Sequence, residues 1–256
     1  MIAFASDALA GVAGAWRYLA AAGFGLLAGQ LATVAARFLP DARLGPWPVH
    51  PCVTCGGRGR ATDVFATLGW LVRGHRCSRC RTPLSAVPPL MEVANALLWT
   101  ALLYRWGLSP RTAVLMAFVT ALLVLIVVDF EHFLLPDAIT LPGIVAGVVA
   151  CTLPGWPVSL LDSALTAGVG YFVMMALAKV AESYYGEEAL GQGDWKMVAM
   201  LGAFLGSTKA LTTVLIANGA GAIFGLLLVA TLGERGRQKL PLGTFLGAAG
   251  IAMVFW

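Results

Sequence analysis

The chain has 256 residues, of which 59% are hydrophobic and 12% are charged, with a net charge of +4 and a mean hydropathy of +0.82. An ordinary soluble domain carries about 25% charged residues, so this composition excludes that class and favours a membrane protein. The basic residues show neither interleaved aromatic residues nor a helical stripe. We therefore expect no nucleic acid among the partners.

Apolar segments recur along the whole chain, and a membrane-spanning helix needs about 20 predominantly apolar residues. The sequence predicts about eight such helices, at residues 9–36, 86–104, 111–129, 138–153, 158–181, 195–207, 209–231 and 240–256. The fold class that follows is an all-α polytopic membrane protein. Asp7 precedes the first apolar run and no basic residue does, so we expect a spanning helix there and not a cleaved signal peptide.

The basic residues predict the orientation, because lysine and arginine are enriched on the cytoplasmic side of membrane proteins. With eight crossings, one side holds Arg17, Arg105, Arg111 and Lys209, which leaves 13 of the 17 basic residues for the other side. The long loop at 40–85 is therefore predicted to be cytoplasmic, with both chain ends outside. The positive charge also favours contact with anionic membrane lipid.

Residues 40–85 differ from the rest of the chain, because they are rich in proline and arginine and contain no apolar span. We divide the chain accordingly into a first transmembrane helix at 1–39, a cytoplasmic domain at 40–85 and a transmembrane core at 86–256. A domain of this size is too small for much of a hydrophobic core, and such domains usually need a disulfide or a metal.

Four cysteines in this loop predict a metal site. Cys52 and Cys55 form one C-x2-C pair, and Cys77 and Cys80 form a second pair after 21 intervening residues. Thiolates at this spacing can close a tetrahedral zinc site, whereas the reducing cytoplasm disfavours disulfides. A structural Zn²⁺ is favoured over a catalytic one, because four cysteine ligands leave no open position for water.

Two aspartates stand at the ends of predicted spans. Asp129 ends the apolar run at 122–129, and Asp194 opens the sixth span within residues 191–196 (GQGDWK). Ionisable residues beside hydrocarbon are costly and are candidates for function by default. Both aspartates belong at the cytoplasmic boundary, one at a helix C-terminus and one at an N-terminus. Two neighbouring helices could therefore bring the carboxyl groups face to face.

Two carboxyls that share one site cannot both ionise cheaply, so one of them keeps its proton. The ionised carboxyl can take a proton from water and the protonated one can polarise a peptide carbonyl, as in aspartic proteases. Gly191 and Gly193 fit this interpretation, because glycine lets backbone approach closely, as a substrate strand would require. The alternative is structural, with Asp194 as a helix N-cap and Asp129 as a residue that reaches water at the membrane edge.

At these residues the chain resembles the type IV prepilin peptidases, the bacterial branch of the G-x-G-D aspartic proteases, over nearly its whole length. The matching parts occur in the order of that family. They are the two cysteine pairs and residues 29–34 (GQLATV), 37–40 (RFLP), 89–92 (PLME), 129–137 (DFEHFLLPD) and 188–197 (EALGQGDWKM).

The resemblance implies cleavage of a prepilin or pseudopilin leader just after a glycine, at the cytoplasmic face of the bacterial inner membrane. Asp129 and Asp194 are the catalytic residues in this interpretation. It also implies N-methylation of the new terminal residue with S-adenosylmethionine, an activity that the family associates with the cysteine-containing loop.

Two alternatives stay open. One is a leader peptidase without methyltransferase activity, because Gln30 and Thr33 replace a serine and an asparagine of the family and residues 73–77 (RGHRC) are one residue longer. The other is a small membrane transporter or scaffold with a zinc module.

Three further charged residues are candidates for supporting the site. Glu92 opens the second span, where it either orients a substrate amine or favours the N-terminus of its own helix. Asp137 follows Pro136 at the start of the fourth span, and we expect it to be an N-cap. Lys196 follows Asp194 by two residues and either balances the charge of the pair, binds lipid phosphate or reaches out to the interface.

Overall fold

The structure, a computed structural model, describes residues 2–40, 55, 65–77, 79–185, 191–232 and 240–256. The regular elements of these residues are all helices, so the predicted all-α class is confirmed. They are α1 (Ile2–Phe38), α2 (Ala66–Val72), α3 (Val87–Trp106), α4 (Pro110–His132), α5 (Asp137–Ala150), α6 (Leu160–Tyr185), α7 (Gln192–Leu232) and α8 (Leu242–Phe255).

The chain divides into two compact units, Met1–Thr120 and Ala121–Trp256, and α4 begins in the first and ends in the second. The predicted division at 1–39, 40–85 and 86–256 is based on the expected membrane spans, whereas the two units are defined by contacts between residues. It stays a prediction, because residues 41–54 and 56–64 lie outside the described part of the chain.

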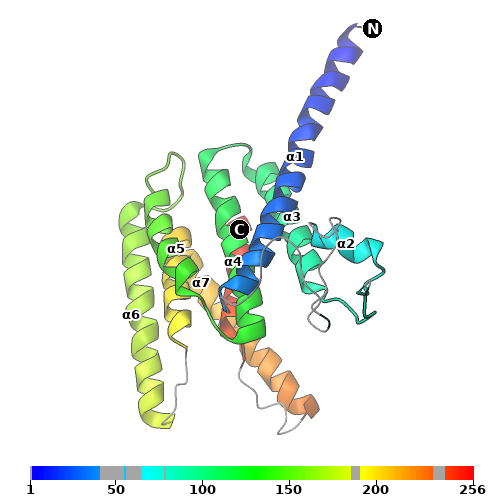
Figure 1. Ribbon diagram of the computed structural model, residues 1–256. Coiled ribbons are helices and arrows are strands. Elements are labelled where there is room, and N and C mark those ends of the chain that lie inside the picture. Colours follow the sequence, from blue (N-terminus) through cyan, green and yellow to red (C-terminus); the bar gives the residue numbers. More distant parts are fainter. Residues whose placement is uncertain (1, 41–54, 56–64, 78, 186–190, 233–239) are drawn as a thin grey trace. The chain divides into compact units, whose positions relative to one another are not determined.

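In the first unit α1 packs along α3, and α2 packs beside α3 (Figure 1). Gly25 and Gly29 lie one turn apart on α1, against the backbone of Ala96 and Glu92. Small residues at this spacing let two membrane helices touch backbone to backbone. Asn95 of α3 strengthens the contact, because its Nδ2 donates to the carbonyl of Gly25 at 2.8 Å.

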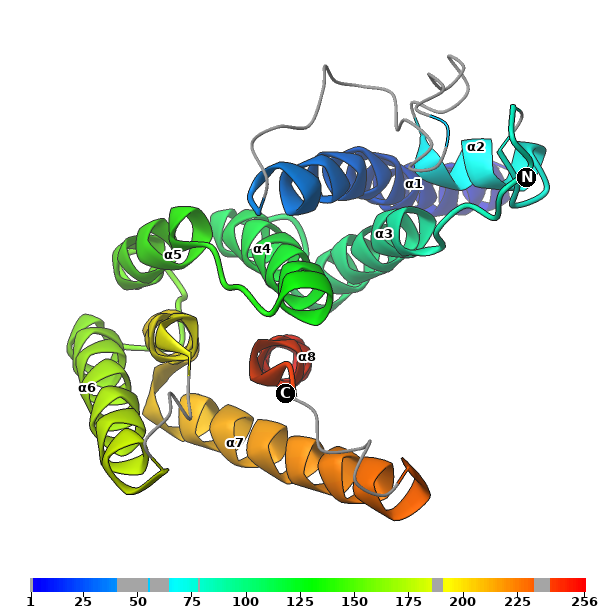
Figure 2. The ribbon, with the colours of Figure 1, turned by 60° about the horizontal axis from the view of Figure 1, so that its bottom comes forward.

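In the second unit α7 packs against α5, α6 and α8 (Figure 2). Its first half is nearly all buried, including Met197, Met200 and Leu201, which places this half-helix at the centre of the unit. The centre of the second unit is thus the helix that Asp194 opens.

A break at Gly206 divides α7 into two halves. Gly206 has φ 74°, in the left-handed region that glycine adopts without penalty. Asp162 at the start of α6 covers the break, because its carboxylate accepts the N–H of Ser207 at 3.3 Å. The break falls at the end of the span predicted at 195–207, just before the span predicted at 209–231.

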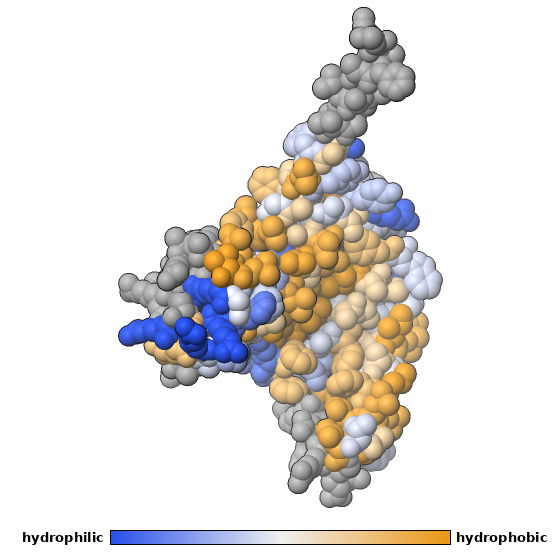
Figure 3. Space-filling model, turned by 90° about the vertical axis from the view of Figure 1, so that its right-hand side faces the viewer, coloured by the Kyte–Doolittle hydropathy of each residue, from blue (hydrophilic) through white to orange (hydrophobic). Residues whose placement is uncertain are grey.

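Among the described residues, five helices are long and apolar enough to cross a membrane: Gly14–Phe38, Val87–Trp106, Pro110–His132, Leu160–Tyr184 and Gln192–Leu232. Asp137–Ala150 and Leu242–Phe255 are apolar but shorter. Apolar side chains cover much of the face that Figure 3 shows, as lipid contact requires. A multi-span membrane protein is therefore confirmed, whereas the count of eight spans stays a prediction.

Candidate active site and cysteine cluster

Asp129 lies in the last turn of α4. Its backbone carbonyl accepts the N–H of Phe133 at 2.9 Å, and Phe133 then leaves the helix with φ 53°. The side chain of Asp129 is only 5% exposed. A buried carboxyl needs hydrogen-bond donors or a proton, because an ionised group without partners is expensive to bury.

The donors come from the N-terminus of α8. The N–H of Thr244 donates to Oδ2 of Asp129 at 2.6 Å, and the Thr244 hydroxyl lies 3.1 Å from the same oxygen. A Cβ on Gly243 would lie 2.9 Å from Cγ of Asp129, so a larger residue there would displace the carboxyl. The first turn of a helix suits this task, because its N–H groups lack partners and carry partial positive charge.

Asp194 lies in the first turn of α7, where the sequence predicts it, and its N–H donates to the carbonyl of Gly191 at 3.1 Å. Its carboxyl is close enough to that of Asp129 for the two charges to interact. The structure thus brings together the two aspartates that the sequence singled out, one from a helix C-terminus and one from an N-terminus.

Leu135 sets the approach of the helices that carry this pair. A Cβ on Gly193 would lie 2.6 Å from Cβ of Leu135, and one on Gly243 would lie 2.9 Å from its Cδ2. Leu135 therefore fills the space beside both glycines. The close approach at Gly193 is made by Leu135, so the structure gives this glycine a packing role within the chain itself.

Like charges in one buried site favour a shared proton, and such a pair titrates as a unit. One member can then accept a proton while the other donates one. This arrangement can support general acid–base chemistry on a bound water, and the carboxyls need no metal for it.

Lys196 and Asp137 pair with each other. Nζ of Lys196 donates to Oδ1 and Oδ2 of Asp137 at 2.7 and 2.8 Å. The prediction that Asp137 is an N-cap is wrong, because Pro136 holds that position and Asp137 is the first residue of α5. The reason is tertiary: the Lys196 ammonium is a stronger partner for the carboxylate than the helix N–H groups beside it.

Glu92 has a role that neither sequence-based interpretation anticipated. It is fully buried in α3, and its two oxygens accept the N–H groups of Ala66 and Thr67 at 2.7 and 2.8 Å. The Thr67 hydroxyl adds a bond of 2.6 Å to Oε2. Glu92 therefore caps the N-terminus of α2 and fastens this helix to α3.

Three cysteines gather next to α2. The sulfur atoms of Cys55, Cys77 and Cys80 lie within 4.8 Å of one another, and those of Cys55 and Cys77 are 3.8 Å apart. A tetrahedral site with Zn–S bonds of about 2.3 Å separates its sulfurs by about 3.8 Å. The N–H of Arg79 donates to Sγ of Cys77 at 3.4 Å, as expected beside a thiolate. These residues fit a zinc ion, and the fourth predicted ligand, Cys52, lies outside the described residues.

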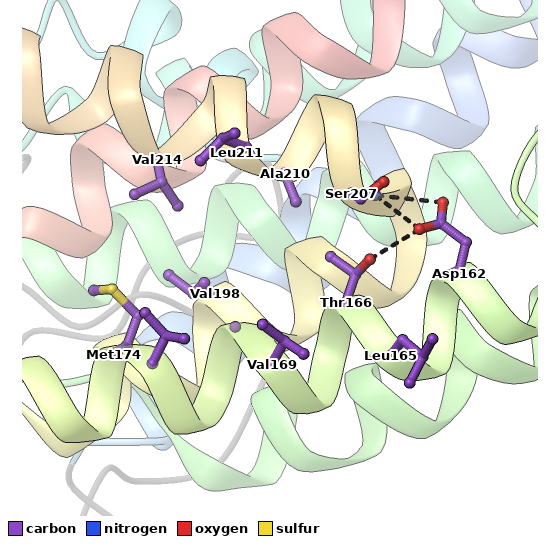
Figure 4. Close-up of a pocket in the computed structure, with 12 residues that line it drawn as sticks. Asp162, Leu165, Thr166, Val169, Met174, Val198, Ser207, Ala210, Leu211 and Val214 are labelled. Carbon is purple, nitrogen blue, oxygen red and sulfur yellow. Dashed lines mark hydrogen bonds between the residues drawn. The ribbon is translucent and has the colours of Figure 1, made fainter.

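A cavity of about 440 Å³ lies elsewhere, between α6 and α7 (Figure 4). Its lining is largely apolar, and at one end Asp162 meets Thr166 and Ser207. Neither Asp129 nor Asp194 lines this cavity. The candidate active site is therefore defined by its paired side chains at the helix ends.

Gly243 and Thr244 are not among the site residues that the sequence predicts. Their signal is weak, since residues 241–244 (PLGT) read only as the start of a helix after a proline. Nothing local links them to Asp129, which precedes Thr244 by 115 residues.

The helices define an integral membrane protein, and comparison with known proteins supplies the family. Residues 116–226 match the type IV leader peptidase family, and residues 24–106 match the bacterial peptidase A24 N-terminal domain. The chain belongs to the type IV leader peptidase family. No solved structure matches it significantly.

Curated relatives extend over most of the chain. A prepilin leader peptidase/N-methyltransferase of Pseudomonas putida is 34% identical over 209 residues, 82% of this chain and 72% of the relative. A protein of the same description from Stutzerimonas stutzeri is 29% identical over 219 residues, 86% and 73% of the two chains. One from Burkholderia pseudomallei K96243 is 34% identical over 209 residues, 82% and 67% of the two chains.

Proposed function

We propose that this protein cleaves the leader peptide of type IV prepilins or pseudopilins after a glycine, and that it N-methylates the new terminal residue. Asp129 and Asp194 perform the cleavage. The proposal rests chiefly on one observation: this chain, a member of the type IV leader peptidase family, places the two carboxyls near each other at the ends of two apolar helices.

The cleavage follows from the chemistry of the pair. The ionised carboxyl takes a proton from water while the resulting hydroxide attacks the scissile carbonyl carbon. The protonated carboxyl gives its proton to the carbonyl oxygen, which yields a tetrahedral intermediate. The first carboxyl then returns its proton to the amide nitrogen and the C–N bond breaks. The second carboxyl recovers its proton from the collapsing intermediate, and the leader leaves with a new carboxyl terminus.

We also propose eight membrane crossings. They are α1, α3, α4 and α6, the short α5 and α8, and the two halves of α7. In support, Nζ of Lys209, just after the break in α7, donates to the carbonyl of Met253 at 3.1 Å, near the end of α8. Phe224, later in α7, packs against Phe245 at the start of α8, so the second half of α7 and α8 are antiparallel. With the predicted orientation, both aspartates and the cysteine cluster face the cytoplasm of a bacterial inner membrane.

The cysteine cluster would hold a structural zinc through Cys52, Cys55, Cys77 and Cys80. When bound, such an ion cross-links the loop and, with four cysteine ligands, has no position for a reacting group. We assign methylation to the unit that contains this loop, with S-adenosylmethionine as the methyl donor.

Loss of methylation is the second candidate, and helix packing explains two of the three departures that suggest it. Gln30 and Thr33, which depart from the family pattern, are 3% and 2% exposed. The Thr33 hydroxyl donates to the carbonyl of Gly29 at 2.9 Å, within the contact between α1 and α3. Both departures are thus accommodated by helix packing. Labelled S-adenosylmethionine with cleaved pilin tests this directly, and transfer of label would exclude the second candidate.

The decisive experiment for the proteolytic function is cleavage of a prepilin with a glycine before its apolar segment, in detergent or lipid. Wild type should release the leader, and Asp194→Asn should release it far more slowly. Glu131→Gln is a matched control, because Glu131 lies in the same last turn of α4 as Asp129 and its side chain is 40% exposed. Normal processing by Asp194→Asn would remove this residue from the chemistry. No processing by wild type on a panel of leaders would refute the function itself.

A further inference from the structure

The two aspartates are not equally supplied with hydrogen-bond donors. Oδ2 of Asp129 accepts both the backbone N–H and the hydroxyl of Thr244, at 2.6 and 3.1 Å. From the part of the chain that the structure describes, Asp194 receives the N–H of Gly191. Donors that point to a carboxylate favour its ionised form, and such charge-assisted bonds are roughly twice as strong as neutral ones.

The helix that carries Thr244 also favours an ionised Asp129. Thr244 lies in the first turn of α8, whose N–H groups present partial positive charge to Asp129. Gly243 leaves room for the carboxyl to approach, because any Cβ there would lie 3.0 Å from Oδ2. Asp194 lies in the first turn of its own helix, α7, whereas Asp129 lies in the last turn of α4, where the helix dipole disfavours negative charge. The α8 N-terminus therefore offsets an unfavourable position for an ionised Asp129.

We propose that Thr244 is a positioning residue that holds Asp129 ionised, so that Asp129 is the general base and Asp194 carries the shared proton. This inference rests on the proposed proteolytic function and deepens it. Asp129 takes the proton of the attacking water, and Asp194 gives its proton to the carbonyl oxygen. Asp129 then passes the proton it gained to the leaving nitrogen, and Asp194 recovers its own as the tetrahedral intermediate collapses.

Three substitutions test the role of Thr244. Thr244→Val keeps the volume and the N–H but removes the hydroxyl, and we expect kcat to fall about tenfold with KM unchanged, since a hydrogen bond to a charged group contributes about that factor. Thr244→Ser restores the hydroxyl and should restore most of kcat. Thr213→Val is the control for loss of a threonine hydroxyl, because Thr213 also lies in a helix of the second unit and its hydroxyl donates to a backbone carbonyl, that of Lys209 at 2.7 Å.

The melting temperature of each preparation, compared with that of wild type, shows whether the variant is folded. If Thr244→Val cleaves like wild type, or if Thr244→Ser is as impaired as Thr244→Val, the positioning role is overturned. If wild type itself cleaves nothing, the proposed function fails instead, so the two failures are distinguishable.

The assignment of base and acid has its own test. Asp194→Asn leaves an amide that can still donate to the carbonyl oxygen, whereas Asp129→Asn leaves nothing that accepts a proton from water. Both variants fall well below wild type, and the residual rate of Asp194→Asn should exceed that of Asp129→Asn by about tenfold, within the range of general-base contributions. Equal residual rates, or the reverse order, would overturn the assignment.

Discussion

Each of the two units contains a buried carboxylate that binds the N-terminus of a neighbouring helix. In the first unit Glu92 binds the N–H groups and the threonine hydroxyl at the start of α2. In the second unit Asp129 binds the N–H and hydroxyl of Thr244 at the start of α8. The donors are of the same kind, and both carboxylates stand on apolar helices.

The two carboxylates differ in how many of their oxygens are used to bind the neighbouring helix. Both oxygens of Glu92 are occupied by α2, so this residue can only hold the helix in place. In the bonds to Thr244 one oxygen of Asp129 is occupied, and a second carboxyl, that of Asp194, is near enough to interact. The same capping chemistry therefore gives a structural anchor in one unit and a candidate catalytic group in the other.

Removal of zinc should have the largest effect on activity, and it should affect the first unit and not the second. We expect chelation to abolish methylation while cleavage survives, because structural zinc sites contribute about 10–16 kcal/mol to the folding of small metal-binding peptides. Both activities are measured before chelation, after it, and after zinc is added back.

Cys77→Ser should reproduce the effect of chelation on methylation, whereas Cys151→Ser should not. Cys151 is the matched control, since its thiol donates to the carbonyl of Gly147 at 3.4 Å in the second unit. Loss of cleavage on chelation to the same degree as methylation would contradict a purely structural metal.

Gly193→Ala tests the geometry of the aspartate pair. The new Cβ would clash with Leu135, and displacement of a catalytic group by about 1 Å can cost roughly 100-fold in rate. Cleavage should fall by about that factor and recover in part when Leu135→Gly is added, because the contact is with Cβ of Leu135. Gly168→Ala in α6 is the control, because nothing lies within 4 Å of a Cβ at that position. Unimpaired cleavage by Gly193→Ala would refute the close approach.

Glu92→Gln tests the anchoring carboxylate of the first unit. The amide keeps one acceptor but loses the charge, which weakens the cap of α2 by about 1–2 kcal/mol, or roughly tenfold in local opening. Hydrogen exchange of the α2 amides should accelerate and methylation should fall, with cleavage preserved. Unchanged exchange in α2 would show that this cap does not hold the helix.

Lys196→Met should have the smallest effect. The side chain of Asp137 is 56% exposed and that of Lys196 is 18% exposed, and ion pairs that reach solvent contribute about 0–1 kcal/mol. The melting temperature and the cleavage rate should change little, as for Lys179→Met, which breaks the exposed pair with Glu182. A large loss of cleavage on Lys196→Met alone would assign Lys196 to the site.

Much of the architecture could be predicted because its signals are local. A run of apolar residues defines a span wherever it lies, and the aspartates at 129 and 194 stand out because they interrupt such runs. The pairing of these two residues also followed, since helix direction and loop charge place both on one side of the membrane.

The partners of the charged residues could not be predicted, because they are set by tertiary contact. Glu92 caps a helix that begins 26 residues before it, and Lys196 pairs with Asp137, which precedes it by 59 residues. Thr244 carries no motif at all. From its local sequence, each of these residues looks like an ordinary residue near a helix end. Its partner is brought beside it only by the tertiary fold.

The most direct test of the account is a single cleavage assay on prepilin with wild type, Asp129→Asn and Glu92→Gln side by side. The account predicts that Asp129→Asn loses at least about 100-fold in rate, as expected for a lost general base, while Glu92→Gln cleaves nearly as wild type does. Cleavage by Asp129→Asn at the wild-type rate, or an equal loss in Glu92→Gln, would contradict the distinction between a catalytic and an anchoring carboxylate.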